Sequence, residues 1–289
     1  MKIYGLLIVK NEAEVLQRCI DSYSKALDGF YILDTGSADI NYLKKINSEK
    51  NVTLFFDDFK NFRFDVARNE LISKVENIVS LDDSTYFMMI DADDLHDGSQ
   101  LPLLTKDVYS VQYETSPRFL MKAFRLWKAK LKLRYQDAVH EYLKWYQPAE
   151  VGFLDVKIYH KPLPTKVKDP ERNYKLLRKE MPTLRQLFYM GNELMDLNRP
   201  KEAIIYWKHY IDRANVEGAK YADELMCCYW RLARYTKNKY DALIIAEEGL
   251  QKFPRCAELK GEIAYRNENN FIKDIEWFDH LFGERNFYL

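Results

Sequence analysis

The first hundred residues alternate between short apolar runs and segments whose apolar residues recur at helical spacing. Residues 11–23 and 67–75 have the helical spacing, and they lie between runs that are apolar enough to be buried strands. Strands that alternate with helices predict an α/β fold with a mainly parallel sheet. The predicted strands are residues 3–9, 30–33, 52–56 and 86–90.

The pattern changes twice further along the chain. Between residues 108 and 160 the runs are strand-like, and residues 161–170 are rich in proline and lysine, which is typical of a linker. Beyond this segment only helical patterns follow. We therefore expect an α/β domain over residues 1–165, a linker or lid over residues 166–180 and an all-helical domain over residues 181–289.

The predicted helical domain carries a weak internal repeat. Gly191 and Ala203 lie twelve positions apart, and Ala242 lies twelve positions before Pro254, as in the helix pairs of tetratricopeptide repeats. The spacing from Ala203 to Ala242 is 39 residues, whereas the ideal repeat is about 34 residues long. A third, degenerate unit is expected over residues 257–282. The alternative is an array of helical hairpins with no repeat ancestry.

Charge limits the classes of partner. Lysine and arginine together number 44, as do aspartate and glutamate, so the net charge is zero. A protein whose whole surface binds nucleic acid is normally basic, so we expect no nucleic-acid partner. A local basic pocket for a diphosphate is compatible with this balance. The 47% apolar and 30% charged residues suit a folded chain with a sizeable core.

The cysteines and the N-terminus indicate in which cellular compartment the protein is expected. Four cysteines are too few and too irregularly spaced for a disulfide framework or a zinc site, so we expect reduced thiols. The N-terminus has only a short apolar run, and we see no signal peptide. No run approaches the roughly 18 apolar residues of a transmembrane segment. These features predict a cytoplasmic protein, bacterial or, if viral, in the host cytoplasm.

Polar residues follow three predicted strands at the point where each strand ends. Asn11 follows the first strand, Asp34 ends the second, and Asp91 follows the fourth. The carboxyl ends of parallel strands meet at one edge of a sheet, and ligands of α/β proteins bind outside that edge. We therefore expect these residues to lie on one rim and to form a ligand site.

Asp91 and Asp93 are the main chemical signal at this rim. Alternate side chains of an extended chain point the same way, so the spacing aims both carboxylates to one side, with Asp94 on the other. Two carboxylates can hold Mn²⁺ or Mg²⁺ that also bridges phosphate oxygens. Such an ion neutralises the charge on a departing nucleotide diphosphate. Taken alone, the motif is equally typical of a solvated acidic turn.

Several fragments occur in the order seen in glycosyltransferase family 2, which this sequence resembles over residues 3–180. Later fragments resemble the subgroup that includes lipopolysaccharide-core glucosyltransferases and enzymes fused to tetratricopeptide repeats. The fragments are LIVKNEA (7–13), LDTGSAD (33–39), DF (58–59), ARN (67–69), IDADD (90–94), FRL (124–126) and VHE (139–141). The resemblance implies a GT-A fold, in which a Rossmann-like domain binds a nucleotide sugar, followed by tetratricopeptide-like helices.

The resemblance also implies roles for individual residues. Asp34 would accept a hydrogen bond from the nucleobase beside a tight turn at Thr35 and Gly36, and Arg68 would bind phosphate oxygens. The alternative for Arg68 is an ordinary ion pair with Asp65 or Glu70. The expected nucleotide-sugar-binding residues on the rim are Val9, Asn11, Glu12, Asp34, Thr35, Gly36, Arg68, Asn69, Asp91 and Ala92.

Catalysis and metal binding are expected to involve later residues. Glu141 is the expected base that takes the acceptor's proton, with His140 beside it as an orienting residue or a metal ligand. Asp93, Asp91 and His160 are the expected metal ligands, and the sequence leaves the choice between His140 and His160 open. Lys166 and Arg172 would close over the diphosphate, the alternative being a charged surface linker.

The function implied by the resemblance is transfer of a sugar from a nucleotide-diphosphate sugar, with inversion at the anomeric carbon. UDP is the most frequent nucleotide of the family. The acceptor is a glycan, a lipid-linked glycan or a protein, and the helical domain is a candidate surface for a homodimer. Two alternatives stay open: a non-catalytic scaffold of helical repeats, and a phosphotransferase of the haloacid-dehalogenase type, which also has two aspartates after a strand.

Overall fold

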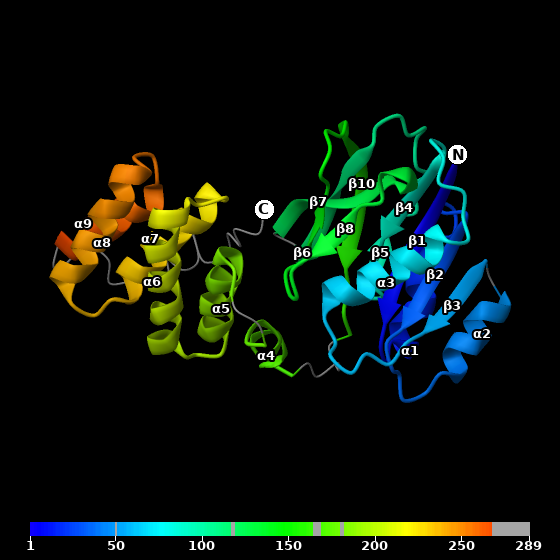
Figure 1. The fold of residues 1–289 in the computed structure, drawn as a ribbon, viewed down its shortest axis with the longest axis horizontal. Helices are drawn as coiled ribbons and strands as arrows, with labels where there is room; N and C mark the ends of the chain where they lie inside the picture. Colours follow the sequence, from blue (N-terminus) through cyan, green and yellow to red (C-terminus); the bar gives the residue numbers. More distant parts are fainter. Residues whose placement is uncertain (50, 117–118, 164–168, 180–181, 268–289) are drawn as a thin grey trace. The chain divides into compact units, whose positions relative to one another are not determined.

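The computed structural model describes residues 1–49, 51–116, 119–163, 169–179 and 182–267. The chain divides into two compact units, Met1–Val167 and Lys168–Leu289. The first unit is a mixed α/β domain, and the described part of the second unit consists of helices (Figure 1). The predicted α/β class of the first unit is therefore confirmed.

One eight-stranded sheet forms the centre of the first unit. Its strands are β1 (Lys2–Val9), β2 (Gly29–Asp34), β3 (Val52–Phe56), β4 (Thr85–Met89), β5 (Asp94–His96), β6 (Val108–Ser116), β7 (Phe119–Lys128) and β10 (Val151–His160). They lie in the order β3-β2-β1-β4-β7-β6-β10-β5. The four strands predicted first, β1 to β4, are mutually parallel. The other half of the sheet is mixed. β7 runs antiparallel to both of its neighbours, β4 and β6. β5 runs antiparallel to β10.

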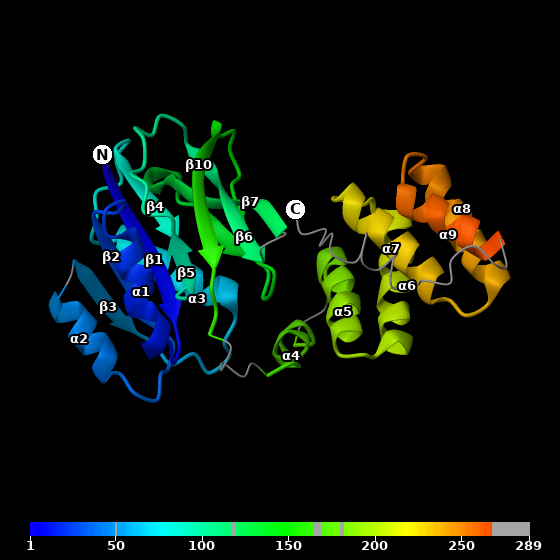
Figure 2. The same ribbon diagram turned by 180° about the vertical axis from the view of Figure 1, so that it is seen from behind.

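Helices cover both faces of the parallel half of the sheet (Figures 1 and 2). α1 (Ala13–Tyr23) and α2 (Asn41–Glu49) pack on one face, and α3 (Phe64–Glu76) packs on the other. A two-stranded ribbon of β8 (Arg134–Gln136) and β9 (Tyr142–Lys144) follows a 3-10 turn at Ala129–Leu131 and packs beside α3. Successive residues of β1 serve the two cores, since Leu6 packs with α3 and Leu7 with α1.

The described part of the second unit is an array in which each helix packs on the next. The helices are α4 (Arg172–Leu177), α5 (Leu184–Asp196), α6 (Pro200–Glu217), α7 (Ala222–Tyr235), α8 (Lys239–Lys252) and α9 (Ala257–Asn267). α4 lies within the predicted linker, residues 166–180. Of the predicted third repeat unit, residues 268–282 lie outside the described residues. The relation of this array to tetratricopeptide repeats remains a prediction.

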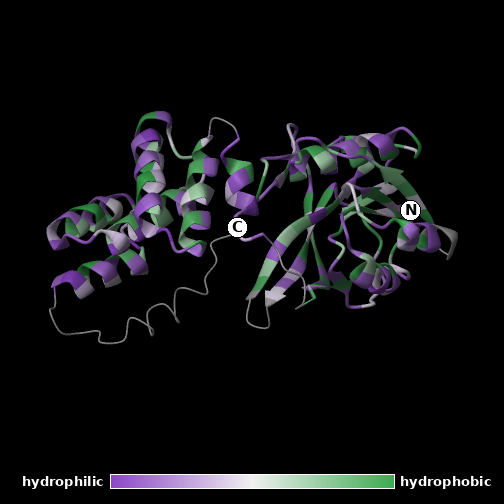
Figure 3. Cartoon of the chain, turned by 90° about the horizontal axis from the view of Figure 1, so that it is seen from below, coloured by the Kyte–Doolittle hydropathy of each residue, from purple (hydrophilic) through white to green (hydrophobic). Residues whose placement is uncertain are grey.

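Close packing of α5 on α6 explains one of the small residues of the repeat pattern. The indole of Trp207, which is fully buried, lies against the backbone of Gly191, so that a Cβ atom there would overlap the indole ring. Trp207 Nε1 also donates a hydrogen bond of 3.3 Å to Asn192 Oδ1. The helices show alternating hydrophilic and hydrophobic bands (Figure 3), as expected when one face of each is buried.

Candidate functional site

The loops after β1 and β2 are bound together at the carboxyl edge of the parallel strands. Thr35 donates two hydrogen bonds to the carbonyl oxygen of Val9, from its backbone N–H (2.9 Å) and its hydroxyl (3.0 Å). Asn11 receives a bond from Ala38 N–H at its side-chain oxygen (2.9 Å) and donates its own N–H to Ser37 Oγ (2.7 Å). Three of the residues expected to bind the nucleotide are thus brought together.

Asp34 shapes the turn that ends β2. Its carboxylate accepts hydrogen bonds from the N–H of Gly36 (3.0 Å) and of Ser37 (2.9 Å) and from the Ser37 hydroxyl. Asp34 is only 3% exposed. Gly36 has a φ of 99°, in the left-handed region that favours glycine. Glu12, which precedes α1, donates its N–H to the Tyr42 hydroxyl at 3.4 Å.

Asp91 lies between two arginines. One carboxylate oxygen is 2.8 Å from Arg68 Nη2 and the other is 3.0 Å from Arg125 Nη2. Burial opposes ionisation of Asp91, but the charges of Arg125 and Arg68 outweigh it and hold its pKa well below the usual value. Arg68 Nε is also 2.8 Å from Glu141 Oε1. Asp91 is therefore an ionised bridge between the two guanidinium groups.

Two expectations about Arg68 meet different outcomes. The alternative that it pairs with Asp65 or Glu70 is wrong, because Asp65 pairs with Arg63 at 2.8 Å and Glu70 with Lys74 at 2.9 Å. Its proposed contact with phosphate oxygens stays a prediction. The guanidinium group faces the rim residues Asp91 and Glu141, and the Arg68 side chain is only 9% exposed.

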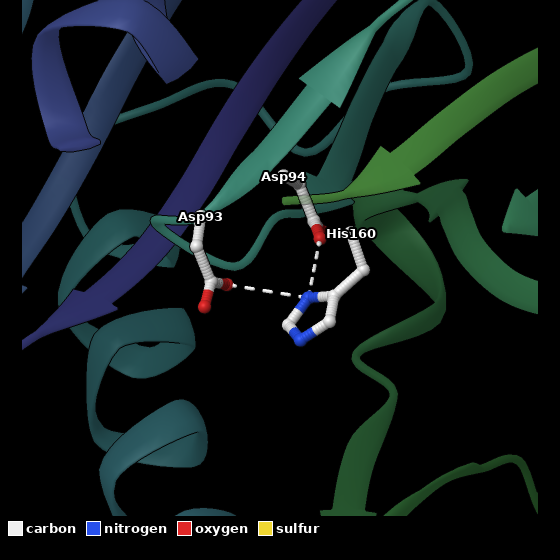
Figure 4. A group of neighbouring side chains, drawn as sticks. All are labelled: Asp93, Asp94 and His160. Carbon is white, nitrogen blue, oxygen red and sulfur yellow. Dashed lines mark ion pairs between the residues drawn. The ribbon is translucent and has the colours of Figure 1, made fainter. Parts of the chain in front are cut away.

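A second group joins Asp93, Asp94 and His160 (Figure 4). His160 Nδ1 lies 3.4 Å from Asp93 Oδ1 and 3.5 Å from Asp94 Oδ1, and one potential ligand atom of each residue lies within 4.8 Å of the others. The group forms because β5 pairs antiparallel with β10, which puts His160 opposite Asp94. Tyr113 supports it by donating its hydroxyl to Asp94 Oδ1 at 2.8 Å.

The group of Asp93, Asp94 and His160, here called the metal group, contains Asp94. The spacing of the motif predicts Asp91 in its place. That expectation assumed an extended chain, but β4 ends at Met89 and residues 91–94 turn. The N–H of Asp94 bonds to the carbonyl of Asp91 (3.0 Å), and the N–H of Asp91 bonds to Asp94 Oδ2 (3.1 Å). The turn ends the alternation of side chains, so Asp93 and Asp94 face His160 while Asp91 faces the arginines.

The chemistry of the metal group fits a divalent cation. Two carboxylates and one imidazole are donors that Mn²⁺ accepts readily, whereas Mg²⁺ prefers oxygen ligands alone. Burial and the nearby charge of Asp91 raise the pKa of Asp94, and the bond to Asp94 raises the pKa of His160. Among the described residues of the site, four carboxylates (Asp91, Asp93, Asp94 and Glu141) face two guanidinium groups and one imidazole, so the carboxylates outnumber the cationic groups that pair with them.

The structure separates the two candidate histidines. His160 belongs to the metal group, and His140 does not among the described residues. His140 has a φ of 54° and precedes Glu141, whose side chain is 12% exposed. The ion pair with Arg68 uses Glu141 Oε1, and no bond of Oε2 occurs within the described residues. Glu141 and the metal group thus both lie next to the Arg68–Asp91–Arg125 bridge.

Four further expected site residues have other outcomes. Asn69 donates to the carbonyl of Tyr135 and accepts its N–H, both at 2.8 Å, so its amide joins α3 to β8. Ala92 is buried in the core. Lys166 lies outside the described residues. Arg172 begins α4 in the second unit, where its guanidinium donates to Asn173 Oδ1.

Arg125 is the site residue that we did not expect. It pairs with Asp91, lies 4.0 Å from Asp94, and its guanidinium stands 4.5 Å from the centre of the Tyr113 ring. The sequence does carry a signal for it. A single charge in the apolar run Phe124-Arg125-Leu126-Trp127 requires a buried partner.

The described part of the chain contains no helix long and apolar enough to cross a membrane. No family profile matches the sequence. Two curated proteins are each 24% identical to it over 281 residues: the SPbeta prophage-derived glycosyltransferase SunS of Bacillus subtilis (strain 168) and the glycosyltransferase SunS of Bacillus phage SPbeta. The match covers 88% of this chain and 64% of each relative, so the chain spans less than two thirds of their length.

Solved structures of two other proteins are also similar in part. The S. aureus TarS 1-349 structure in complex with UDP-GlcNAc has a TM-score of 0.46 and 10% identity, covering 91% of this chain and 89% of that chain. Glucosyl-3-phosphoglycerate synthase from Mycobacterium tuberculosis, in complex with Mn²⁺ and UDP-glucose, has a TM-score of 0.28 and 21% identity. This match covers 39% of this chain and 44% of the synthase chain.

Proposed function

We propose that this chain is a metal-dependent glycosyltransferase of the GT-A type that takes its sugar from a nucleotide-diphosphate sugar. The observation that carries the proposal is the group of Asp93, Asp94 and His160 at the carboxyl edge of the parallel strands. Similarity to two relatives named as glycosyltransferases, over 88% of this chain, supports it. The rim is where an α/β sheet of this kind binds its ligands.

Asp93, Asp94 and His160 would hold the metal ion. A divalent cation held there would offset the negative charge that develops on the diphosphate when the bond to the anomeric carbon breaks and its electron pair stays with the diphosphate. Because the carboxylates of the site outnumber its cationic groups, they would repel the anionic diphosphate unless such a cation were bound. We propose Mn²⁺ as the preferred ion, because His160 supplies a nitrogen ligand, and Mg²⁺ as the alternative.

The nucleoside would lie over the joined loops after β1 and β2. The residues proposed for this part of the rim are Val9, Asn11, Glu12, Asp34, Thr35 and Gly36, of which Val9, Asp34 and Thr35 are buried and would act by shaping the two loops. Arg68 and Asp91 pair at 2.8 Å, and Asp91 is hydrogen-bonded to Asp94 of the metal group, so we propose that the ribose and the phosphates pass over this pair. Asp34 and Asn69 act mainly through the backbone groups that they hold in place.

Glu141 is the proposed base of an inverting transfer. Its Oε2 would take the proton of the acceptor as the acceptor atom bonds to the anomeric carbon and the bond to the diphosphate breaks. Arg68 holds the other carboxylate oxygen at 2.8 Å and so fixes the direction of the side chain. The acceptor itself is proposed to be a glycan or a protein, with the second unit, of tetratricopeptide-like helices, as the surface that receives it.

The two competing functions fit the site less well. In a phosphotransferase of the haloacid-dehalogenase type the first aspartate attacks phosphorus, but both oxygens of Asp91 are ion-paired to arginines. In an inert scaffold there is no reason for a charge to be buried at Arg125 beside a potential metal group. The glycosyltransferase proposal accounts for both features.

A binding experiment tests the proposal directly. The full chain is titrated by calorimetry with UDP, GDP, CDP and dTDP, each with Mn²⁺, with Mg²⁺ and with EDTA. We expect one nucleotide to bind at micromolar concentration with Mn²⁺ and at least tenfold more weakly with EDTA, and the matching nucleotide sugar to be slowly hydrolysed. Failure of all four nucleotides to bind in the presence of metal would overturn the proposal.

A further inference from the structure

Asp34, the residue expected to accept a hydrogen bond from the nucleobase, and its neighbour Thr35 are both engaged in hydrogen bonds at the turn after β2. The Asp34 carboxylate accepts three hydrogen bonds from its own turn, and the Thr35 hydroxyl donates to the carbonyl of Val9. Both residues are less than 5% exposed. Because both side chains are buried and engaged in these hydrogen bonds, neither reaches a base lying over the rim, and recognition of the base requires another group.

Asp58 supplies such a group next to the same turn. Its Oδ1 lies 3.1 Å from the point that a Cβ atom on Gly36 would occupy, so the carboxylate stands directly beside the bare glycine. Asp58 follows β3, the neighbour of β2, and its side chain is exposed. Its carboxylate has no hydrogen bond or ion pair to any other described residue. Asp58 is thus an open acceptor at the nucleoside end of the rim.

Lys10 stands on the same turn. Its Nζ lies 3.7 Å from the same point beside Gly36. An exposed carboxylate and an exposed ammonium therefore flank a residue without a side chain. This arrangement offers one acceptor and one donor across a gap, which matches a flat ring that carries an N–H next to a carbonyl oxygen.

We propose that Asp58 accepts a hydrogen bond from the ring N–H of the donor's nucleobase and thereby selects bases that have one. The inference rests on the proposed function and deepens it. Uracil, thymine and guanine carry a ring N–H beside a carbonyl, which Lys10 would contact. Cytosine and adenine present a nitrogen lone pair at the equivalent position, and a lone pair facing a carboxylate is repelled.

The neighbouring aspartate provides a matched comparison. Asp57 also follows β3, but its backbone N–H donates to the carbonyl of Asp34 at 2.9 Å and its residue is half-buried. Asp57→Asn and Asp58→Asn remove the same charge one position apart. Only Asp58→Asn changes the group beside Gly36. Its carboxamide can accept from a uracil N–H, but it can also turn and donate to the ring nitrogen of cytosine.

The test is calorimetric titration of the full chain with UDP, GDP and CDP in the presence of Mn²⁺. In the unmodified protein we expect UDP or GDP to bind at least tenfold more tightly than CDP. Asp58→Asn should reduce this ratio about tenfold, in line with the worth of one charged base contact, and Asp58→Ala should weaken the preferred nucleotide without improving CDP. Asp57→Asn should leave the ratio unchanged.

The contrary results separate the role of Asp58 from the proposed function. If the unmodified protein binds a nucleotide but Asp58→Asn keeps the same ratio as Asp57→Asn, the role of Asp58 is overturned and the proposed function stands. Preferred binding of CDP by the unmodified protein has the same meaning. If none of the nucleotides binds, both proposals fall together. Melting temperatures within about 2 °C of the unmodified protein would show that the variants are folded.

Discussion

Arg125 and Asp91 form an ion pair of 3.0 Å between strand β7 and the turn after β4. Arg68 holds the other oxygen of the same carboxylate at 2.8 Å. The two arginines thus direct Asp91 away from the metal group, although Asp91 and Asp93 are only two positions apart. The pairing of β7 with β4, in which Leu126 lies opposite Met88, makes this contact possible.

We predict that Arg125→Gln lowers the free energy of unfolding by roughly 2 to 4 kcal/mol. The substitution leaves the carboxylate of Asp91 with one partner fewer and removes the cation that stands over the Tyr113 ring. Urea unfolding followed by circular dichroism would measure the change. Lys122→Gln, an exposed position on the same strand, is the control and should cost less than about 0.5 kcal/mol. Equal effects of both substitutions would contradict the buried bridge.

Gly191→Ala is predicted to destabilise the second unit by about 1 to 3 kcal/mol. The added methyl group would overlap the indole of Trp207, which is fully buried and has no room to move. Thermal unfolding would measure the loss. In the double variant Gly191→Ala with Trp207→Phe, the smaller ring makes room for the methyl group. The cost of Gly191→Ala should therefore be smaller in the Trp207→Phe background than in the unmodified protein, and an equal cost would rule out this contact as the cause.

Asp93→Asn is predicted to abolish the Mn²⁺ dependence of nucleotide binding and to reduce transfer at least 100-fold. It replaces one anionic ligand of the proposed metal group with a neutral amide, which binds divalent cations more weakly. Titration of Mn²⁺ at fixed nucleotide would give the metal affinity. Asp83→Asn is the matched control, since Asp83 is an exposed aspartate just before β4, at the other end of the strand. A normal Mn²⁺ titration by Asp93→Asn would contradict the proposed ligand.

Much of this arrangement could be predicted from the sequence, and the rest depended on strand pairing. The runs that became β1 to β4 are short and apolar, so their existence and burial could be predicted from local pattern alone. Asp93 could be named from its position after a strand, and His160 from its place at the end of a strand together with the family resemblance. The partnership of Asp94 with His160 could not, because it arises from the antiparallel pairing of β5 with β10 across more than sixty residues of chain.

Arg125 is a second case in which the sequence pattern identifies a site residue but not its partner. Its place in an apolar run indicated a buried charge, but the partner lies 34 residues away, in a turn that the alternation of an extended strand does not describe. Periodicity predicts which face a side chain occupies within one element. It carries no information about which elements become neighbours, and the site draws its side chains from α3, β5, β7 and β10 and from the loops next to them.

Glu141→Gln is predicted to reduce the turnover number roughly 100- to 10,000-fold, as expected for loss of a general base. The amide keeps the size of the side chain and an oxygen next to Arg68, so the dissociation constant of the nucleotide should change less than about threefold. Steady-state kinetics combined with calorimetry would separate the two effects. Glu150→Gln, at an exposed glutamate that pairs with Lys106, should leave both quantities unchanged.

The same variant distinguishes a base from a residue that only positions Arg68. If Glu141 acts through Arg68, then Glu141→Gln should weaken nucleotide binding and lower turnover by similar factors, and Arg68→Lys should reproduce both changes. If Glu141 takes the acceptor's proton, turnover falls while nucleotide binding stays unchanged, and hydrolysis of the donor falls as well because water loses the same base. A variant with normal nucleotide binding and normal transfer would remove Glu141 from the mechanism.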